Sequence, residues 1–270
     1  MNTYLMRASG RVVGKSALLL LAVVVLLTLA PLSPPDHVVL AERLQAPGAT
    51  HWLGTDPLGR DLLSRLLAGA RITLGLALSA VALAGLVGTL VGLLAGYAGG
   101  IWDALLMRLV DMQLALPTLL LALLVIAVLG PGVGNLVCVL ALTGWTRYAR
   151  IVRGQALMLR DREFILSAHA IGAGAWRIML RHLLPNLLAP VLVIATLELA
   201  RLIVVESALS YLGLGVQPPT ASWGRMLAEG QVYLASAWWV VTFPGLAIVL
   251  SVLCINLAGD RLRHRFDPRP

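Results

Sequence analysis

The chain has 270 residues, of which 59% are hydrophobic and 13% are charged. A typical soluble domain has about 25% charged residues, so the composition excludes an ordinary soluble fold. Disorder is excluded too, because a disordered chain combines low hydrophobicity with high charge. The formal net charge is +8. Excess basic residues are typical of the cytoplasmic loops of membrane proteins, and the composition therefore predicts an integral membrane protein.

Apolar runs predict six transmembrane helices, since a helix needs roughly 20 apolar residues to cross a bilayer. In chain order the runs are 16–32, 72–97, 105–129, 135–148, 183–205 and 239–258. Basic residues followed by such a first run are also typical of a cleavable signal peptide. An uncleaved first helix is the favoured interpretation, because the rest of the chain is itself embedded in the membrane.

Basic residues are concentrated between the fourth and fifth runs, where the stretch 147–182 contains seven arginines. The positive-inside rule places this loop and both ends of the chain in the cytoplasm. The chain then divides into three parts. Residues 1–71 form a cytoplasmic tail, the first helix and an extracytoplasmic segment, 72–258 form a core of five helices, and 259–270 form a second tail.

Small residues recur at every fourth position along the second run. In lipid, this spacing lets two helix backbones approach closely, so we expect the second helix to pack tightly against a neighbour. The members of this small-residue ridge are Ala80, Ala84, Gly88, Gly92 and Gly96.

The arginine-rich loop contains a short amphipathic pattern. Glu163 places a negative charge in the first turn of a predicted helix, where the helix dipole favours it. Phe164, Ala168 and Ile171 then follow at helical spacing as one apolar stripe. Gly172 comes next, and glycine commonly ends a helix. Such a helix suits docking into a groove of a partner protein, and the alternative is a helix that rests on lipid headgroups.

The fifth run contains Glu198 and Arg201, and Glu206 follows at its end. Charges within a membrane span are costly and usually face protein or water. Glu198 and Arg201 are three residues apart on a helix, so they can pair locally. These three residues are therefore candidates for the lining of a pathway or for a gate, and the alternative is a structural pair at a subunit interface.

Motifs for catalysis, nucleotide binding or metal binding are lacking. The segment Gly14-Lys15-Ser16 resembles the end of a phosphate-binding loop. That loop needs four residues between its two glycines, whereas only three separate Gly10 from Gly14, and Ser9 stands at the required position. An outer metal-binding pair, His37 and His51, is a minor alternative. Cys138 and Cys254 lie in apolar runs, which favours buried thiols over a disulfide. The sequence therefore predicts a non-catalytic membrane subunit without a metal.

The loop resembles the EAA motif of ABC-importer permeases. In that motif Glu-Ala-Ala is followed after three residues by Gly and, nine residues later, by Ile-x-Leu-Pro. The matching segments here are Leu166-Ser167-Ala168, Gly172 and His182-Leu183-Leu184-Pro185. The spacing agrees throughout, while Leu166, Ser167 and His182 replace the motif's Glu, Ala and Ile.

Three further segments resemble a narrower group, the C-type permeases of dipeptide, oligopeptide and nickel importers. They are LGTDPLGRD at 53–61, ESALSYLGLGVQPP at 206–219, and GDRLR at 259–263 with DPR at 267–269. Together with the loop, these segments extend over most of the chain.

The resemblance implies an all-α type I importer permease with six transmembrane helices and a cytoplasmic coupling helix, in the bacterial inner membrane. It implies four partners: a homologous B-type permease, two cytoplasmic ATPases and an extracytoplasmic solute-binding protein. ATP and magnesium would bind to the ATPases, and no cofactor to this chain. The residues expected to couple to the ATPases are Glu163, Phe164, Leu166, Ser167, Ala168, Ile171, Gly172 and Pro185.

Peptides are the expected substrates, because di- and oligopeptides are carried by permeases of this kind. Nickel or a metal–chelator complex is the alternative within the same family. A secondary transporter is an alternative of a different class, but it would require intramembrane carboxylates or broken helices in two related halves of the chain. An integral membrane enzyme would require a polar catalytic cluster at membrane depth.

Overall fold

The computed structural model describes residues 35–266, and the first expected span, 16–32, lies outside them. The described part is all-α, with one isolated β-bridge between Thr55 and Asp61. Its elements are η1 (Leu40–Glu42), α2 (Leu62–Ala98), α3 (Gly100–Leu114), α4 (Thr118–Leu129), α5 (Val133–Arg160), α6 (Glu163–Ala170), α7 (Ala175–Arg177), the π-helix η2 (Ile178–Leu183), α8 (Leu184–Tyr211), α9 (Trp223–Gly230), η3 (Gln231–Tyr233) and α10 (Trp239–Phe266).

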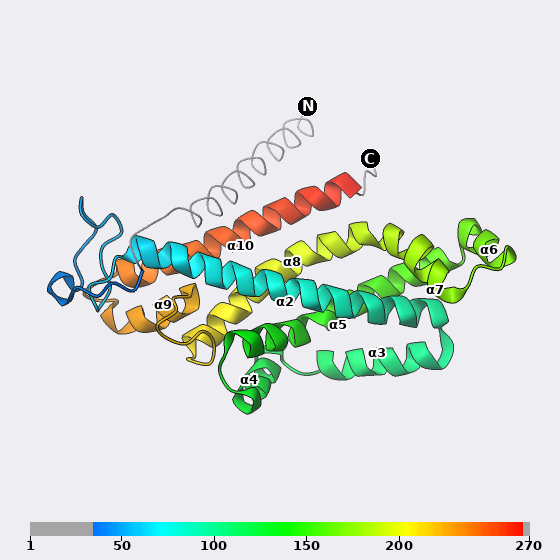
Figure 1. Cartoon of the computed structure of the whole chain (residues 1–270), viewed down its shortest axis with the longest axis horizontal. Helices are drawn as coiled ribbons and strands as arrows, with labels where there is room; N and C mark the ends of the chain where they lie inside the picture. The colour runs from blue at the N-terminus through cyan, green and yellow to red at the C-terminus, as the bar shows by residue number, and fades with distance from the viewer. Residues whose placement is uncertain (1–34, 267–270) are drawn as a thin grey trace.

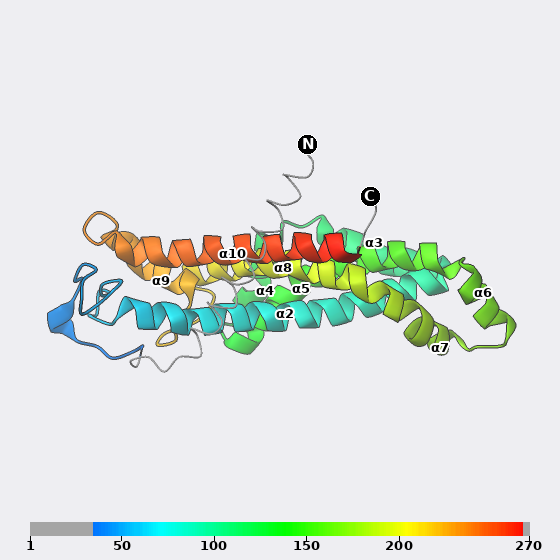
Figure 2. The same cartoon turned by 90° about the horizontal axis from the view of Figure 1, so that it is seen from above.

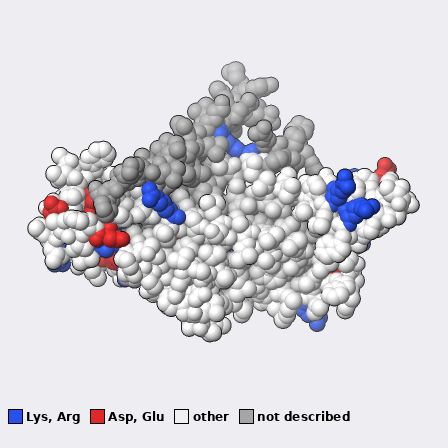
Figure 3. All heavy atoms as spheres, in the orientation of Figure 1, with Lys and Arg blue, Asp and Glu red and all other residues white. Residues whose placement is uncertain are grey.

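The long helices α2, α5, α8 and α10 run along the long axis of the molecule (Figures 1 and 2). The short helices α6 and α7 lie at one end, and the segment 35–61 lies with α9 at the other. On the face drawn in Figure 3, most of the visible charged atoms lie towards these two ends, and the visible surface between them is mostly uncharged. Such a surface suits a membrane-crossing protein, because charges in hydrocarbon are costly.

Helix α2 begins earlier than the apolar run that predicted it. The Asp61 side chain caps it by accepting a hydrogen bond from the amide of Ser64, and the helix ends at Gly99, whose φ is +66°. At 1.5 Å per residue its 37 residues extend about 55 Å, well beyond the ~30 Å hydrocarbon core of a bilayer. The ends of α2 must therefore reach past the membrane.

The third predicted span is not one straight helix. The run 105–129 is divided between α3 and α4, which meet at 92°. Pro117 lies at the break with ψ of 125°, outside the helical range. Proline cannot donate the helical hydrogen bond, and it forces the preceding residue out of the α conformation. The described residues thus contain three helices that are long and apolar enough to span, or four if this bent pair is one span.

The boundary between the fourth span and the arginine-rich loop was also wrong. Helix α5 continues to Arg160, so the predicted loop 147–182 begins inside a helix. Its arginines are accommodated because Arg150 pairs with Asp111 and Arg153 pairs with Asp103, both on α3. With these arginines, α5 is not among the described helices that are long and apolar enough to span a membrane.

The predicted second loop helix, 175–184, merges with the fifth span. Residues Ala175–Tyr211 form a continuous helix of 37 residues that comprises α7, η2 and α8. Pro185 lies inside this continuous helix, directly after the π-helical segment η2. The last helix likewise continues into the expected tail 259–270, as far as Phe266. Tertiary contacts thus extend four of the expected helices beyond their apolar runs.

The largest buried cluster joins α2, α4, α5, α8 and α10 in the middle of the molecule, with fully buried Ala77, Leu140 and Leu202 among its members. A second cluster lies beneath α6 and η2, and a third lies under α9 at the opposite end. Both ends of the bundle are therefore packed against the core.

Candidate functional site

The small-residue ridge of α2 lies against the backbone of α5. A Cβ atom on Gly88 would lie 2.2 Å from the carbonyl oxygen of Trp145, and one on Gly92 would lie 2.4 Å from that of Ala149. No real Cβ contact is this short, so only glycine fits at either position. The other ridge members are buried as well: Ala80, Ala84 and Gly96. The ridge brings two backbones into direct contact.

Helix α6 ends in a geometry that requires glycine. Gly172 has φ of +80°, the left-handed region that side chains disfavour. Its amide donates to the His169 carbonyl at 2.9 Å, and the Ala173 amide donates to the Ala168 carbonyl at 3.0 Å. These two bonds form a Schellman motif, which satisfies the free carbonyls at the end of the helix.

The predicted stripe on α6 does not form one face. Ala168 is buried together with Ile165, whereas the side chains of Phe164 and Ile171 are exposed. The difference arises because the inward face of α6 packs on η2 and α5, and Ile171 comes after the last helical residue. Five large apolar side chains on α6 and on the two segments after it are exposed, and we call them together the α6 surface: Phe164, Leu166, Ile171, Trp176 and Leu180.

The other expected coupling residues lie around this surface. Glu163 and Ser167 are exposed on α6, and Pro185 is exposed at the start of α8. The imidazole of His169 stacks on the ring of Tyr97, with 6.1 Å between the ring centroids. Because Tyr97 belongs to the last turn of α2, this contact joins α6 to the end of that helix.

A charged group that we call the midpoint cluster joins α5 to α8. Glu198 accepts from Arg201 at 2.7 Å, and its other carboxylate oxygen pairs with Arg147 at 3.1 Å. Arg201 also donates to the carbonyl of Thr143 at 3.1 Å. The sequence predicted the pair on α8, but it assigned Arg147 to the cytoplasmic loop and so missed the third member. Nothing local to the sequence signals a contact between residues 51 positions apart.

Glu206 does not join the midpoint cluster. It is fully buried, and Ser210 donates to its carboxylate at 2.7 Å while Ser207 donates at 3.4 Å. Side chains of two other elements, Ser222 at the start of α9 and Thr73 on α2, also hydrogen-bond to it. Glu206 therefore connects three helices.

A buried ion-pair network lies at the end opposite α6. Asp56 accepts from Arg60 and Arg65, each at 2.6 Å. Arg65 also reaches Glu229 on α9 at 3.0 Å, and Glu229 pairs with Arg225 at 3.1 Å. Asp56 and Arg65 are almost fully buried. The network joins the segment 53–61, α2 and α9, and no pattern in the sequence predicted the contacts to α9.

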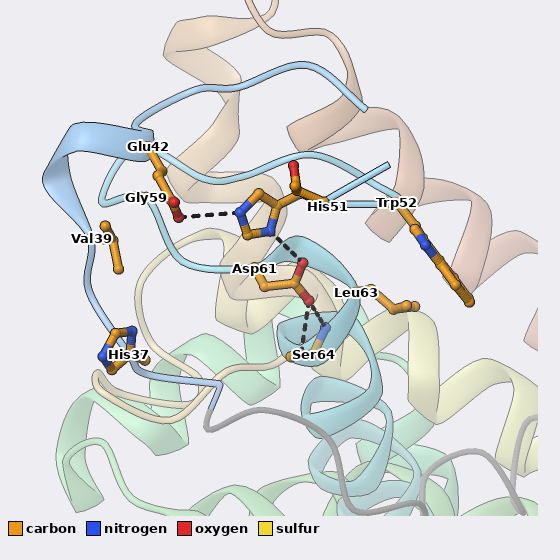
Figure 4. A pocket seen from close by; sticks show the side chains of 10 residues that line it. His37, Val39, Glu42, His51, Trp52, Gly59, Asp61, Leu63 and Ser64 are labelled. Atoms are coloured by element: carbon orange, nitrogen blue, oxygen red, sulfur yellow. Dashed lines mark hydrogen bonds and ion pairs between the residues drawn. The ribbon is translucent and has the colours of Figure 1, made fainter. Parts of the chain in front are cut away.

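His51 bridges two carboxylates in the same region (Figure 4). Its Nδ1 lies 3.0 Å from Asp61 and its Nε2 lies 3.2 Å from Glu42. The hydrogen bond to Asp61, and then that to Glu42, raise the pKa of His51 above 6.5 against the opposing effect of burial. Burial alone would raise the pKa of Asp61, but hydrogen bonds from Ser64 and His51 lower it below 3.8. The bridge lines a cavity of about 530 Å³.

The minor alternatives from the sequence do not form in the described residues. His37 and His51 do not meet, and both ring nitrogens of His51 face carboxylates (Figure 4). Within residues 35–266 no three candidate ligands are grouped to hold a metal ion. Cys138 and Cys254 are both free thiols, the first exposed and the second buried.

Several curated bacterial proteins are similar to the chain. A di/tripeptide transport system permease protein of Pseudomonas aeruginosa is 47% identical over 88% of this chain and 77% of its own length. A probable D,D-dipeptide transport system permease of Escherichia coli is 40% identical over 87% of this chain and 79% of its own. A dipeptide transport system permease of Bacillus subtilis is 40% identical over 93% of this chain and 80% of its own length.

The fold is similar to that of a solved ABC transporter. The inward-facing MetNI methionine transporter matches with a TM-score of 0.61 at 21% identity, over 75% of this chain and 96% of that one. Residues 88–270 match the family model described as the binding-protein-dependent transport system inner membrane component. The chain therefore belongs to the family of inner-membrane components of binding-protein-dependent transport systems.

Proposed function

We propose that the chain is the permease subunit of an ATP-driven peptide importer, and that it forms a substrate pathway with a homologous permease. The support is twofold. The relatives at 40–47% identity are named as permeases for dipeptides or tripeptides. The chain also presents an exposed apolar surface beside a helix end, which suits docking onto a partner.

The observation that carries the proposal is the α6 surface. It lies at one end of the bundle, where the continuous helix Ala175–Tyr211 begins, and this helix runs from there towards the other end. The two ATPases, which bind ATP and magnesium, would sit beneath the permease pair, and the α6 surface would contact them. Closure of the ATPases would move α6 as a rigid body, and the long helix would carry that movement to the opposite end. No catalytic step falls to this chain.

The opposite end would face the outside. There the segment 35–61 and α9 form a surface held together by the ion-pair network, and we propose that a solute-binding protein delivers substrate to it. Glu198 and Arg201 would border the pathway in the middle of the bundle. Glu206 is fully buried among hydroxyl groups, so we propose that it holds α8, α9 and α2 together near an outer gate.

The proposal is tested by reconstituting the chain into proteoliposomes with its partner permease, both ATPases and the binding protein. We expect uptake of a labelled dipeptide that requires ATP and the binding protein. Uptake of nickel or a nickel chelate but no peptide would favour the alternative substrate. Peptide uptake without any ATPase would favour a secondary transporter.

A further inference from the structure

The continuous helix Ala175–Tyr211 has an interrupted stretch near its α6 end. In the π-helix η2, the amide of Leu184 donates to the carbonyl of Met179, five residues back instead of the usual four. Pro185 has no amide proton to continue this series, and Pro190 has none to donate five residues later. Two backbone donors of the helix are therefore missing between residues 184 and 190, directly beside a π-helical turn. Prolines and π-helical turns are the usual places at which helices bend.

Few side chains hold this stretch, which we call the 184–190 segment, in the bundle. Among its residues only Leu187 is buried, whereas Pro185 and Asn186 are exposed. A side chain supplies one additional bond, since Nδ2 of Asn186 donates to the carbonyl of His182 at 2.6 Å. A segment with missing backbone bonds and few buried contacts deforms more easily than the helix on either side of it.

The helix packs against different neighbours before and after the 184–190 segment. Before it, Ile178 and Leu183 share a buried cluster with Ile165 of α6 and with residues of α2 and α5. After it, the helix enters the central cluster with α4 and α10, and Glu206 hydrogen-bonds to side chains of α9 and α2. The part before the segment is therefore attached to α6, and the part after it is fastened to the rest of the bundle.

The neighbouring helices α2 and α5 offer no such place to bend. Neither contains a proline, and their backbones approach closely along the ridge at Gly88 and Gly92. We propose that the 184–190 segment is a hinge, at which the helix Ala175–Tyr211 bends when α6 moves. The part before the hinge moves further than the part after it, so the α6 end of the bundle can open while the opposite end stays packed. This inference rests on the proposed function, and it names the place where the movement of α6 enters the long helix.

The first test measures distances between spin labels in the reconstituted importer, with and without a non-hydrolysable ATP analogue that holds the ATPases closed. Both label pairs are made in a chain without its two native cysteines, at exposed positions of the long helix and of α2. Ala175→Cys with Leu94→Cys reports on the part before the hinge, and Leu197→Cys with Leu78→Cys reports on the part after it. A bend of about 20° at the hinge would move residue 175 by up to about 6 Å. We expect the first distance to change by at least half of that amount and the second distance by much less.

The second test removes both prolines of the hinge. Pro185→Ala combined with Pro190→Ala restores two amide donors and stiffens the helix. We expect the first label distance to stop changing and peptide uptake to fall about tenfold, while the melting temperature is not lowered. The matched control is Pro244→Ala, which restores a donor inside α10, a helix that packs on α8 and α9. It should leave uptake and both label distances unchanged.

Two results would overturn the hinge. Equal changes of the two label distances, or no change in either, would show that the helix does not bend at the 184–190 segment. Unchanged uptake in the double proline variant would show that transport does not require the bend. The label distances are measured in a chain that keeps both prolines, so they decide the question even where the double variant does not fold. Failure of the importer to carry any peptide would instead overturn the proposed function, because the label distances report on the hinge without substrate.

Discussion

Gly92 illustrates at the residue scale how little space separates α2 from α5. A Cβ atom there would meet the Ala149 carbonyl oxygen at 2.4 Å, and backbone atoms cannot move aside singly. Overpacking of this kind typically costs about 1–3 kcal/mol. We expect Gly92→Val to lower the free energy of unfolding by at least that amount, measured by denaturant titration in detergent.

The matched control is Gly75→Ala on the same helix, where an added Cβ atom has nothing within 4 Å. Alanine should stabilise α2 there by about 0.5–1 kcal/mol, since glycine is a poor helix residue. Equal stabilities for the two variants would contradict the close approach of α2 and α5.

His51 gives the segment 35–61 a dependence on pH. Its pKa is raised in the folded protein, so the stabilisation that it provides is complete below 6.5 and is lost as the pH rises through the raised pKa. The pKa of Asp61 is lowered, so the stabilisation that the Asp61 carboxylate provides to the folded segment is complete above pH 3.8 and is lost as the pH falls below that value. We expect proteolysis of the segment to accelerate between neutral and alkaline pH.

The comparison variant is His51→Gln, which cannot become charged. Its proteolysis rate should be higher than that of the wild type at pH 6 and nearly constant with pH, once the protease's own pH dependence is subtracted with an unstructured peptide. If the wild-type proteolysis rate does not change between neutral and alkaline pH, the His51 bridge does not stabilise the segment 35–61.

At the scale of elements, α6 can act as a rigid unit only if its end is fixed. Gly172 holds that end at φ of +80°, where a β-branched side chain is strained by about 1–3 kcal/mol. We expect Gly172→Val to displace the turn and reduce peptide uptake about tenfold, while binding-protein affinity and copurification of the permease pair persist.

Gly174→Ala is the control for this change. Gly174 has φ of −68° and open space around its Cβ position, so alanine fits without strain. Normal uptake by Gly172→Val would argue against α6 as the coupling element.

The orientation in the membrane is a property of the whole molecule. The basic α6 end and the end with α9 lie at opposite extremes of the long axis (Figure 1). We expect a cysteine at exposed Ile171 to react with a membrane-impermeant maleimide only after the cells are opened, and a cysteine at exposed Trp52 to react in intact spheroplasts. Both substitutions are made in a background without Cys138 and Cys254. The reverse labelling pattern would invert the proposed topology.

Sequence alone was sufficient for the class of protein and for the end of one short helix. Composition excluded a soluble fold, the four-residue spacing marked the ridge that contacts α5, and Gly172 marked the end of α6. These features depend on the residue and its near neighbours along the chain. The family followed from the motif spacings, which the relatives confirmed.

Only the tertiary structure decided which charges meet. Arg147 and Glu198 are 51 positions apart, and Arg65 and Glu229 are 164 positions apart, and neither pair leaves a periodic signal. The structure also showed that α5 continues past its apolar run, because acidic residues on α3 neutralise its arginines. Hydropathy counts each charge as a cost, whereas a folded bundle can pair charges from separate helices and so retain them within a span.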